Sequence, residues 1–429
     1  MQKTILLISQ VFPPEHVVGA LRVGNVARAF SRAGHRVIVV TAARAGEQAG
    51  RREWVPGIDV QTVTQGPRYR ERLTRLMRQF QLDGGRERRD AASTAARPGR
   101  GGADGPPRGL RGLLLSLVWV PDDELRFVWP AYRAARRLLR ERVDLVYTSA
   151  PTHSANLVGL LLKRRHGIRW CAEFRDPWCY PQSRPLTPLL DRLNRFLERQ
   201  CLRAVDILVT VTDAAAEMYR ARLGSESDKV IVVRNGIPEM TGRIPPSPGA
   251  PFRIVYSGNI YGRRDPRAFL EAVAEIVRQP DAPALVVDLF VSAVQSDASA
   301  DPLVRELGVG HVVNVYDWVP HEEIQRVIRS ADLLLVLAQR QPLQVPNKVY
   351  EYLATGVPIL AVDDEDGETA RMLRAAGRHY LVTEDRPAAI AAAIRQAIAA
   401  RDAPPVHTPV LDEWRTDRQM ELLVEAVRP

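Results

Sequence analysis

The sequence contains two successive series of short apolar, β-branched segments that alternate with helical patterns, and this alternation restricts the fold more than any other feature. Such segments form parallel sheets that helices cover on both faces. The predicted strands lie at residues 5–9, 36–41, 144–149, 170–174, 206–211 and 229–233, and then at 253–257, 285–291, 312–316, 333–337, 358–362 and 379–382. The sequence therefore predicts an α/β fold of two facing, doubly wound, Rossmann-like domains, with ligands in the cleft between them at the carboxyl ends of the strands.

Five prolines at residues 237–251 are typical of a linker, which separates the two series. Residues 1–236 form the expected N-terminal domain and residues 252–405 the expected C-terminal domain. An apolar pattern at 412–427 predicts a last helix, and we expect residues 406–429 to pack back on the N-terminal domain.

One segment, residues 66–112, carries +7 of the chain's net charge of +10. Within it, residues 84–109 are rich in Gly, Arg, Ala and Pro and are expected to be disordered. Residues 73–80 predict a short basic amphipathic helix, which either docks on an anionic membrane surface or packs on its domain with solvated arginines. Because the charge is concentrated in a low-complexity insert, nucleic acid is not an expected partner.

The chain has no apolar run near the roughly 20 residues that a membrane-spanning helix needs, and its first apolar stretch is too short for a signal peptide. The three cysteines form neither a CxxC pair nor a zinc spacing. We therefore expect a cytoplasmic protein, with the basic helix as a reason to place it peripherally on the inner face of the plasma membrane.

Two acidic runs, at residues 122–124 and 363–366, are interpreted as solvated loops. Neither is an Asp-x-Asp between apolar strand residues, the pattern that would favour a metal site. No metal and no cofactor are expected.

The segment 345–358, Val-Pro-Asn-Lys-Val-Tyr-Glu-Tyr-Leu-Ala-Thr-Gly-Val-Pro, follows a predicted strand and precedes another. Asn347 is expected to cap a helix there, which places Lys348 in the first turn, where the helix dipole disfavours a cation. A bound anion would offset that effect, and Glu351 could then accept hydrogen bonds from ribose hydroxyls. The alternative, a surface Lys–Glu pair at i,i+3, fits the spacing equally well.

This segment resembles the nucleotide-sugar motif of family 4 type glycosyltransferases of the GT-B fold, and the resemblance extends over nearly the whole chain. Further similar segments occur in the family's order at residues 10–15 with Gly19, 149–154, 173–178, 235–236, 256–259, 261–266 and 316–320. The resemblance implies a retaining, metal-independent transfer of a sugar from a nucleotide-diphosphate donor, with UDP or GDP as the nucleotide. The acceptor would be a saccharide or a lipid-linked molecule in cell-surface polysaccharide or glycolipid assembly, bound by the N-terminal domain.

The same resemblance assigns roles to individual residues. Arg263 or Arg264 and Lys348 would contact the diphosphate, and Glu351 would hold the ribose. His153 would face the transferred sugar, so that His153 and Glu351 are the predicted catalytic residues. The remaining predicted donor contacts are Gly19, Val319 in the loop beside the base, and Gly367, Glu368 and Thr369.

Three departures from the family pattern concern the donor. Leu343 stands where the family has the first Glu of a pair, Val18 precedes Gly19 in place of a second Gly, and Pro266 stands near the expected Lys. A nucleotide-sugar epimerase of the same fold and a catalytically silent sugar-nucleotide-binding protein therefore remain as alternatives. His153 alone could also be a helix cap, and Arg175 with Asp176 is interpreted as a structural ion pair.

Overall fold

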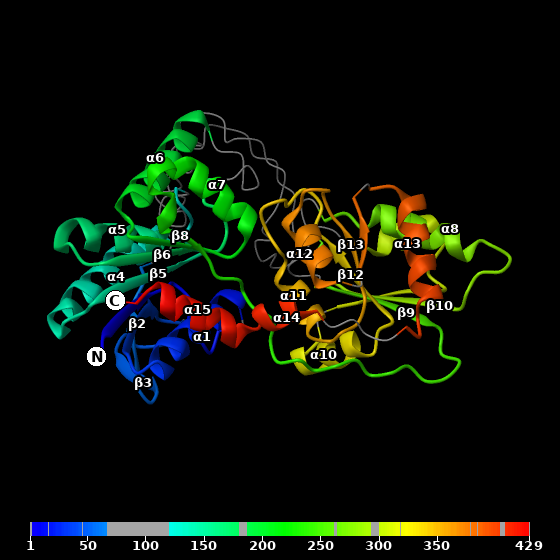
Figure 1. Cartoon of the computed structure of the whole chain (residues 1–429), viewed down its shortest axis with the longest axis horizontal. Coiled ribbons are helices and arrows are strands. Elements are labelled where there is room, and N and C mark those ends of the chain that lie inside the picture. Colours follow the sequence, from blue (N-terminus) through cyan, green and yellow to red (C-terminus); the bar gives the residue numbers. More distant parts are fainter. Residues whose placement is uncertain are drawn as a thin grey trace, which may run out of the picture. The chain divides into compact units, whose positions relative to one another are not determined.

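The computed structural model describes residues 2–15, 17–44, 46–66, 120–179, 187–260, 264–292, 300–317, 319–377, 379–383, 385–403 and 408–428 (Figure 1). The chain divides into two compact units. Among the described residues, unit 1 comprises those up to Arg234 and those from Met420, and unit 2 comprises 235–419. The expected amphipathic helix at 73–80 and the insert at 84–109 lie outside the described residues, as do Arg263 and Trp318.

Unit 1 contains an eight-stranded sheet in the order β3-β4-β2-β1-β5-β6-β7-β8. All neighbouring strands pair in parallel except β3, which runs antiparallel to β4. The strands are β1 (Thr4–Ile8), β2 (Arg36–Ala42), β3 (Arg51–Val55), β4 (Ile58–Val63), β5 (Leu145–Ala150), β6 (Trp170–Phe174), β7 (Ile207–Thr210) and β8 (Val230–Val232).

Both faces of this sheet are buried. Ile5 and Leu7 of β1 lie in one apolar cluster, and Leu6 and Ile8 lie in another, because successive side chains of a strand point to opposite faces. The helices of unit 1 are α1 (Val18–Arg32), α4 (Leu125–Leu138), α5 (Ser154–His166), α6 (Pro188–Ala204) and α7 (Asp213–Leu223). Helix α1 packs in the first cluster, and α4 and α5 pack in the second.

Unit 2 contains a six-stranded parallel sheet in the order β11-β10-β9-β12-β13-β14. Its strands are β9 (Phe252–Ser257), β10 (Leu285–Phe290), β11 (Val313–Tyr316), β12 (Leu333–Leu337), β13 (Ile359–Val362) and β14 (His379–Val382). Its helices are α8 (Arg267–Val277), α9 (Asp301–Leu307), α10 (His321–Arg329), α11 (Asn347–Leu353), α12 (Glu368–Ala376), α13 (Pro387–Ala399) and α14 (Pro409–Glu413), followed by the start of α15 (Thr416–Ala426).

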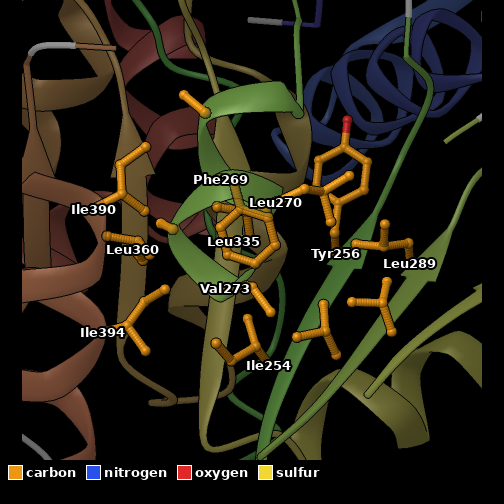
Figure 2. Close-up of a cluster of buried hydrophobic side chains, with 14 of the residues drawn as sticks. Ile254, Tyr256, Phe269, Leu270, Val273, Leu289, Leu335, Leu360, Ile390 and Ile394 are labelled. Carbon is orange, nitrogen blue, oxygen red and sulfur yellow. The ribbon is translucent and has the colours of Figure 1, made fainter. Parts of the chain in front are cut away.

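The core of unit 2 is also divided by its sheet. Figure 2 shows Phe269, Leu270 and Val273 of α8 packed on the sheet, with Ile390 and Ile394 of α13 beside them. The ring of Tyr256 belongs to this cluster, while its hydroxyl points away from the apolar side chains (Figure 2). Tyr256 thus ends the core at the carboxyl end of β9, and its hydroxyl donates to the Asn259 carbonyl at 3.0 Å.

Each sheet has one place where the strand order reverses, between β1 and β5 in unit 1 and between β9 and β12 in unit 2. The chain leaves neighbouring strands in opposite directions there, which opens a crevice at the carboxyl ends of the strands. The predicted site residues follow these strands: Gly19 comes after β1, His153 after β5, and Lys348 and Glu351 after β12.

The twelve predicted strands are all present, with ends that differ by a residue or two. The hairpin of β3 and β4 and the helix α4 were not predicted from the sequence. The last helix expected at 412–427 is present as α15 but begins at Thr416, because the chain breaks at Arg415, which bridges to Ile237, and a separate short helix, α14, precedes it. No helix in the described ranges is long and apolar enough to cross a membrane.

Candidate functional site

The ammonium group of Lys348 is shielded from solvent at the carboxyl edge of unit 2. Its Nζ has no hydrogen-bond partner among the described residues and lies 3.9 Å from the centre of the Tyr256 ring. Burial lowers the pKa of Lys348 well below its usual range, the nearby Arg264 lowers it further, and Glu351 opposes the shift. The alternative of a surface Lys–Glu pair is therefore wrong, because a surface ammonium would remain hydrated.

The backbone makes room for this ammonium at Gly258. A Cβ there would lie 2.3 Å from Nζ and 2.9 Å from Cε of Lys348, and the φ of +154° is one that other residues rarely adopt. Gly258 follows β9 and Lys348 follows β12, so the two strands at the reversal of unit 2 supply both sides of the contact.

Arg264 lies close enough to Lys348 to lower its pKa, so two cations share this edge of the sheet. The Nη2 group of Arg264 donates to Gln341 Oε1 at 3.4 Å. The structure thus places Arg264 beside Lys348, whereas its predicted alternative, Arg263, lies outside the described residues.

Glu351 lies one turn after Lys348 on α11 and is half-buried. Its Oε1 accepts from Asn347 Nδ2 at 3.1 Å and its Oε2 accepts from Gln325 Nε2 at 3.4 Å. Burial raises the pKa of Glu351, while His321 and these two amides act in the opposite direction. The prediction that Asn347 caps the helix is wrong: Pro346 holds the cap position, and the Asn347 side chain instead orients Glu351.

Gly367, Glu368 and Thr369 begin α12 after β13, and all three are buried. The amide of Glu368 donates to the Pro342 carbonyl at 3.0 Å, and the Thr369 hydroxyl donates to the Gln344 carbonyl at 3.4 Å. The Glu368 amide and the Thr369 hydroxyl, which we predicted to contact the donor, thus donate to carbonyl groups of the protein itself. Val319, the remaining predicted donor contact in unit 2, is half-buried in the loop after β11.

Asp363, at the end of β13, is buried beneath this turn, so the prediction of a solvated loop is wrong for this residue. Its Oδ2 accepts from the Ala370 amide at 2.9 Å, whereas its Oδ1 has no partner among the described residues. Burial raises the pKa of Asp363 to about 6, against the effect of the Ala370 and Asp364 amides. A Cβ at Gly367 would lie 2.3 Å from Oδ2, so only glycine fits over the carboxyl.

His153 lies just before α5 in unit 1 and is buried. Its ring stacks on Trp178 with centroids 4.5 Å apart, and Asn156 Nδ2 lies 3.3 Å from its Nδ1. Burial lowers the pKa of His153 to about 3, so the imidazole is neutral at physiological pH. The helix-cap alternative is not observed, since the side chain makes no capping hydrogen bond.

A buried ion pair of Arg22 and Glu173 lies at the same edge of unit 1. Arg22 Nη2 is 2.8 Å from Glu173 Oε1, and Ser149 Oγ donates to Oε2 at 2.6 Å. Burial alone would raise the pKa of Glu173, but Arg22, Ser149 and Arg175 outweigh it, and the pKa is lowered.

Gly19 lies in the first turn of α1, against the guanidinium of Arg175. The predicted ion pair of Arg175 with Asp176 is wrong: Nε and Nη1 of Arg175 have no partner among the described residues. Asp122, predicted in a solvated loop, is half-buried and accepts from Ser154 N at 2.8 Å and Ser154 Oγ at 2.6 Å, which fixes the start of α5.

The sequence did not indicate that Gly258 and Asp363 lie beside the predicted site residues. Gly258 belongs only to a segment that is similar to the family, and Asp363 is one member of an acidic run. Within the described ranges, no group of three His, Cys, Asp or Glu side chains is placed to hold a metal ion.

Comparison with known families gives two matches that follow each other along the chain. Residues 84–236 match the model described as a glycosyl transferase 4-like domain, and residues 242–405 match the model described as glycosyl transferases group 1. The chain is 25% identical over 211 residues to D-inositol 3-phosphate glycosyltransferase 1 of Catenulispora acidiphila. That match covers 43% of this chain and 50% of the relative, so the chain spans about half the length of this curated protein.

Two solved structures are similar over nearly the whole chain. Sucrose-phosphate synthase from Thermosynechococcus elongatus has a TM-score of 0.62 at 16% identity, covering 99% of this chain and 95% of its own. Anabaena HepE in complex with UDP and glucose has a TM-score of 0.61 at 14% identity, covering 99% of both chains. At these identities the similarity establishes the fold alone.

We predict that the wild type becomes less stable to unfolding as pH rises and that Asp363→Asn does not show this decrease. The folded pKa of about 6 lies above the ordinary value of 3.8, so between these values the folded state binds a proton that the unfolded state has released. Stability is then lost as pH rises through this window, by about 3 kcal/mol for a difference of about two pH units.

Urea unfolding at about pH 4 and about pH 7 measures this effect. The stability of Asp363→Asn relative to the wild type should increase with pH, whereas the exposed control Glu365→Gln should show no such trend. A difference that is the same at both pH values would contradict the raised pKa.

We also predict that the His153 ring stays neutral where an ordinary histidine is charged. Its pKa of about 3 leaves the ring unprotonated near pH 5, where a histidine with the ordinary pKa of about 6.5 is charged. NMR titration of ring-labelled histidine, assigned with His153→Asn, measures this. A His153 midpoint near the ordinary value of about 6.5 would contradict the burial that the structure shows.

Proposed function

The chain belongs to the group 1, family 4-like glycosyltransferases of the GT-B fold, and from this premise we propose that it is a retaining, metal-independent enzyme that transfers a sugar from a UDP- or GDP-sugar to a saccharide or lipid-linked acceptor.

The observation that carries this proposal is the unpartnered ammonium of Lys348. A buried charge without a counterion is unfavourable by several kcal/mol, and a bound anion removes that penalty. A nucleotide diphosphate fits because Arg264 adds a second cation at the same edge. Charge builds on the diphosphate as the sugar leaves, so cations already in place stabilise the transition state more than the bound donor.

The position of Glu351 supports ribose binding. Asn347 and Gln325 each donate to one of its two oxygens, which fixes the carboxyl group while both oxygens keep lone pairs for further donors. Vicinal ribose hydroxyls are such donors. Anabaena HepE, which shares the fold, has been solved with UDP and glucose, and this is the class of donor we propose here.

The two cations and the neutral His153 support a metal-independent, retaining reaction. Lys348 and Arg264 supply positive charge to the departing diphosphate, the role that a divalent ion has in metal-dependent enzymes. The His153 ring, with its lowered pKa, acts as a hydrogen-bonding group toward the sugar and takes no proton. The acceptor oxygen then attacks C1 from the face the diphosphate leaves, and its proton passes to a phosphate oxygen of the leaving group.

The exposed face of α6 supports an acceptor carried on a membrane lipid, and with it a peripheral membrane location. Leu189, Leu193 and Phe196 are exposed by 59%, 38% and 52% and lie on one side of the helix at i, i+4 and i+7. Arg192 and Arg199 are exposed beside them. An apolar stripe with flanking arginines is suited to the surface of an anionic bilayer.

We predict that a nucleotide-sugar donor stabilises the protein and that Lys348→Met and Glu351→Gln each abolish this effect. A donor that binds the folded state alone raises the unfolding temperature with its concentration. A thermal-shift screen against UDP-, GDP-, ADP- and dTDP-sugars identifies the nucleotide. Lys229→Met, which changes a lysine of unit 1, should respond to the donor as the wild type does.

The two variants separate the parts of the site. Lys348→Met should lose the response to free nucleoside diphosphate, whereas Glu351→Gln should also weaken the response to the nucleoside alone. An unchanged response in both variants would overturn the proposal. With a donor and acceptor in hand, NMR of the product gives its anomeric configuration, and inversion relative to the donor would exclude retention.

We predict that the α6 surface binds anionic lipid. Replacing Leu193 and Phe196 by Ser should reduce co-flotation with phosphatidylglycerol vesicles several-fold, because it removes apolar area from a reversible contact. Leu189 stays in place, so helix α6 keeps its start, and vesicles of phosphatidylcholine control for charge. Equal flotation of the variant and the wild type would contradict a role for this face.

A further inference from the structure

A chain of three polar side chains leads to His153 through the interior of unit 1, and no role described so far explains it. The chain begins at Trp170 of β6, continues through Thr148 of β5 and Asn156 of α5, and ends at the imidazole of His153. Trp170, Thr148 and Asn156 are fully shielded from solvent. Polar groups buried in this way need partners of the matching kind, so the order of donors and acceptors along the chain is informative.

The first member sets the direction of the chain, because an indole nitrogen can only donate a hydrogen bond. Trp170 Nε1 donates to Thr148 Oγ1 at 2.9 Å, and the Thr148 hydroxyl donates its own proton to Asn156 Oδ1 at 2.7 Å. The carbonyl oxygen of Asn156 is therefore turned toward Thr148, and its Nδ2 lies 3.3 Å from His153 Nδ1. An amide nitrogen also only donates, so Nδ1 accepts and carries no proton.

The neutral ring of His153 must then carry its single proton on Nε2. A neutral imidazole has one donor nitrogen and one acceptor nitrogen. Burial lowers the pKa of His153 to about 3, so the ring holds no second proton at physiological pH. The described residues offer Nε2 no hydrogen-bond partner, since the one side-chain hydrogen bond of His153 is that of Nδ1. The Nε2–H group is thus the part of the ring that the described residues leave unused.

The aromatic neighbours of His153 fix the plane of its ring. Trp178 stacks on the ring with an interplanar angle of 13°, and Phe174 meets it at 78° with centroids 5.4 Å apart. These two contacts do not distinguish the ring from the same ring turned over in its plane, which exchanges the positions of nitrogen and carbon. The hydrogen bond from Asn156 distinguishes them, because it requires a nitrogen that accepts.

The backbone of α5 makes room for the first link of the chain. A Cβ at Gly159 would lie 2.3 Å from Trp170 Nε1, so a larger residue would displace the indole from Thr148. Gly159 comes three residues after Asn156 and therefore lies on the same side of α5. One side of this helix thus holds both the amide that meets His153 and the space for the indole.

We propose that Asn156 and Thr148 are positioning residues that fix the neutral His153 ring as the Nε2–H tautomer, so that the ring donates a hydrogen bond to an oxygen of the transferred sugar. This inference rests on the proposed function for the sugar that meets the ring. Asn156 and Thr148 are buried and act through His153, and Trp170 sets the direction of the chain. The other tautomer would present a lone pair to the sugar at the same place and could only accept a hydrogen bond.

The tautomer is measured on the free, full-length protein by nitrogen NMR of ring-labelled histidine at neutral pH. The His153 signals are assigned by their loss in His153→Asn. We expect a protonated Nε2 and an unprotonated Nδ1, because Asn156 donates to Nδ1. A proton on Nδ1 would mean that the Asn156 amide is turned the other way, and it would overturn the proposal without the use of any positioning variant.

Thr148→Val tests whether the chain holds the tautomer. Valine keeps the shape of the side chain but gives Asn156 Oδ1 no donor, so the amide can turn and accept from Nδ1–H. We expect the Nδ1–H form to appear in Thr148→Val, whereas Thr148→Ser retains the hydroxyl and the wild-type tautomer. Thr210→Val removes a buried hydroxyl from β7 of the same sheet, which donates to the Thr212 carbonyl at 3.3 Å, and controls for a loss of stability alone. An unchanged tautomer in folded Thr148→Val would overturn the positioning role.

Binding separates this inference from the proposed function. UDP lacks the sugar, so Thr148→Val should bind UDP as the wild type does but should bind UDP-glucose several-fold more weakly, the usual loss for one neutral hydrogen bond. The GDP pair is used if the screen identifies GDP. Equal affinity of both proteins for the sugar nucleotide would overturn the contact with the sugar. If no nucleotide sugar binds the wild type, the proposed function fails, whereas a proton on Nδ1 with donor binding intact refutes this inference alone.

Discussion

A parallel sheet with helices on both faces has no polar surface except at its ends, and the chemistry of this protein follows from that constraint. In unit 1 the alternating residues of β1 fill two separate apolar clusters, and in unit 2 those of β9 and β12 do the same. Charged side chains are therefore collected where the strands stop. Lys348 follows β12 and lies against Gly258, whose missing Cβ gives its ammonium group room, and Arg175 follows β6 in unit 1. At the carboxyl edge of each sheet, a cationic side chain thus has nitrogen atoms without a hydrogen-bond partner among the described residues.

Burying such cations is unfavourable for folding, and the free energy gained by burying the apolar clusters must exceed this cost. Lys348 and Arg175 each desolvate a charge without a hydrogen bond in return, and Asp363 buries a carboxyl with one oxygen unused. The Arg22–Glu173 pair shows the opposite case, since both carboxylate oxygens and most guanidinium donors are used within unit 1. The contrast separates charges whose hydrogen-bonding groups are used within the structure from charges whose groups are left unused. A protein selected for stability alone would have replaced the second kind.

The fold and the family could be predicted from the sequence because they depend on features with a period. The strands at 170–174 and 333–337 have the predicted bounds, and every residue in them is buried. The hairpin of β3 and β4 was missed because the charges of Arg51, Arg52 and Glu53 on the exposed edge strand hide the pattern. Side-chain partners were predicted less well. Adjacent residues such as Arg175 and Asp176 suggest an ion pair in the sequence, yet Nε and Nη1 of Arg175 have no partner among the described residues. Asp122 and Asp363 belong to acidic runs in which some side chains face solvent less than the sequence suggests. The roles assigned to Glu351, Lys348 and His153 stay predictions.

The path of the last helix has a consequence for biosynthesis. Helix α15 begins with the residues of unit 2, but Met420, Leu423 and Val427 belong to the apolar cluster of unit 1 that contains Ile5 and Leu7. On the ribosome, the strands of unit 1 emerge long before these three side chains. At about 5–20 residues per second, unit 2 takes roughly 10 to 40 s to be translated. During that interval one face of the first sheet lacks part of its covering, so the nascent chain exposes an apolar surface to chaperones until translation nears its end.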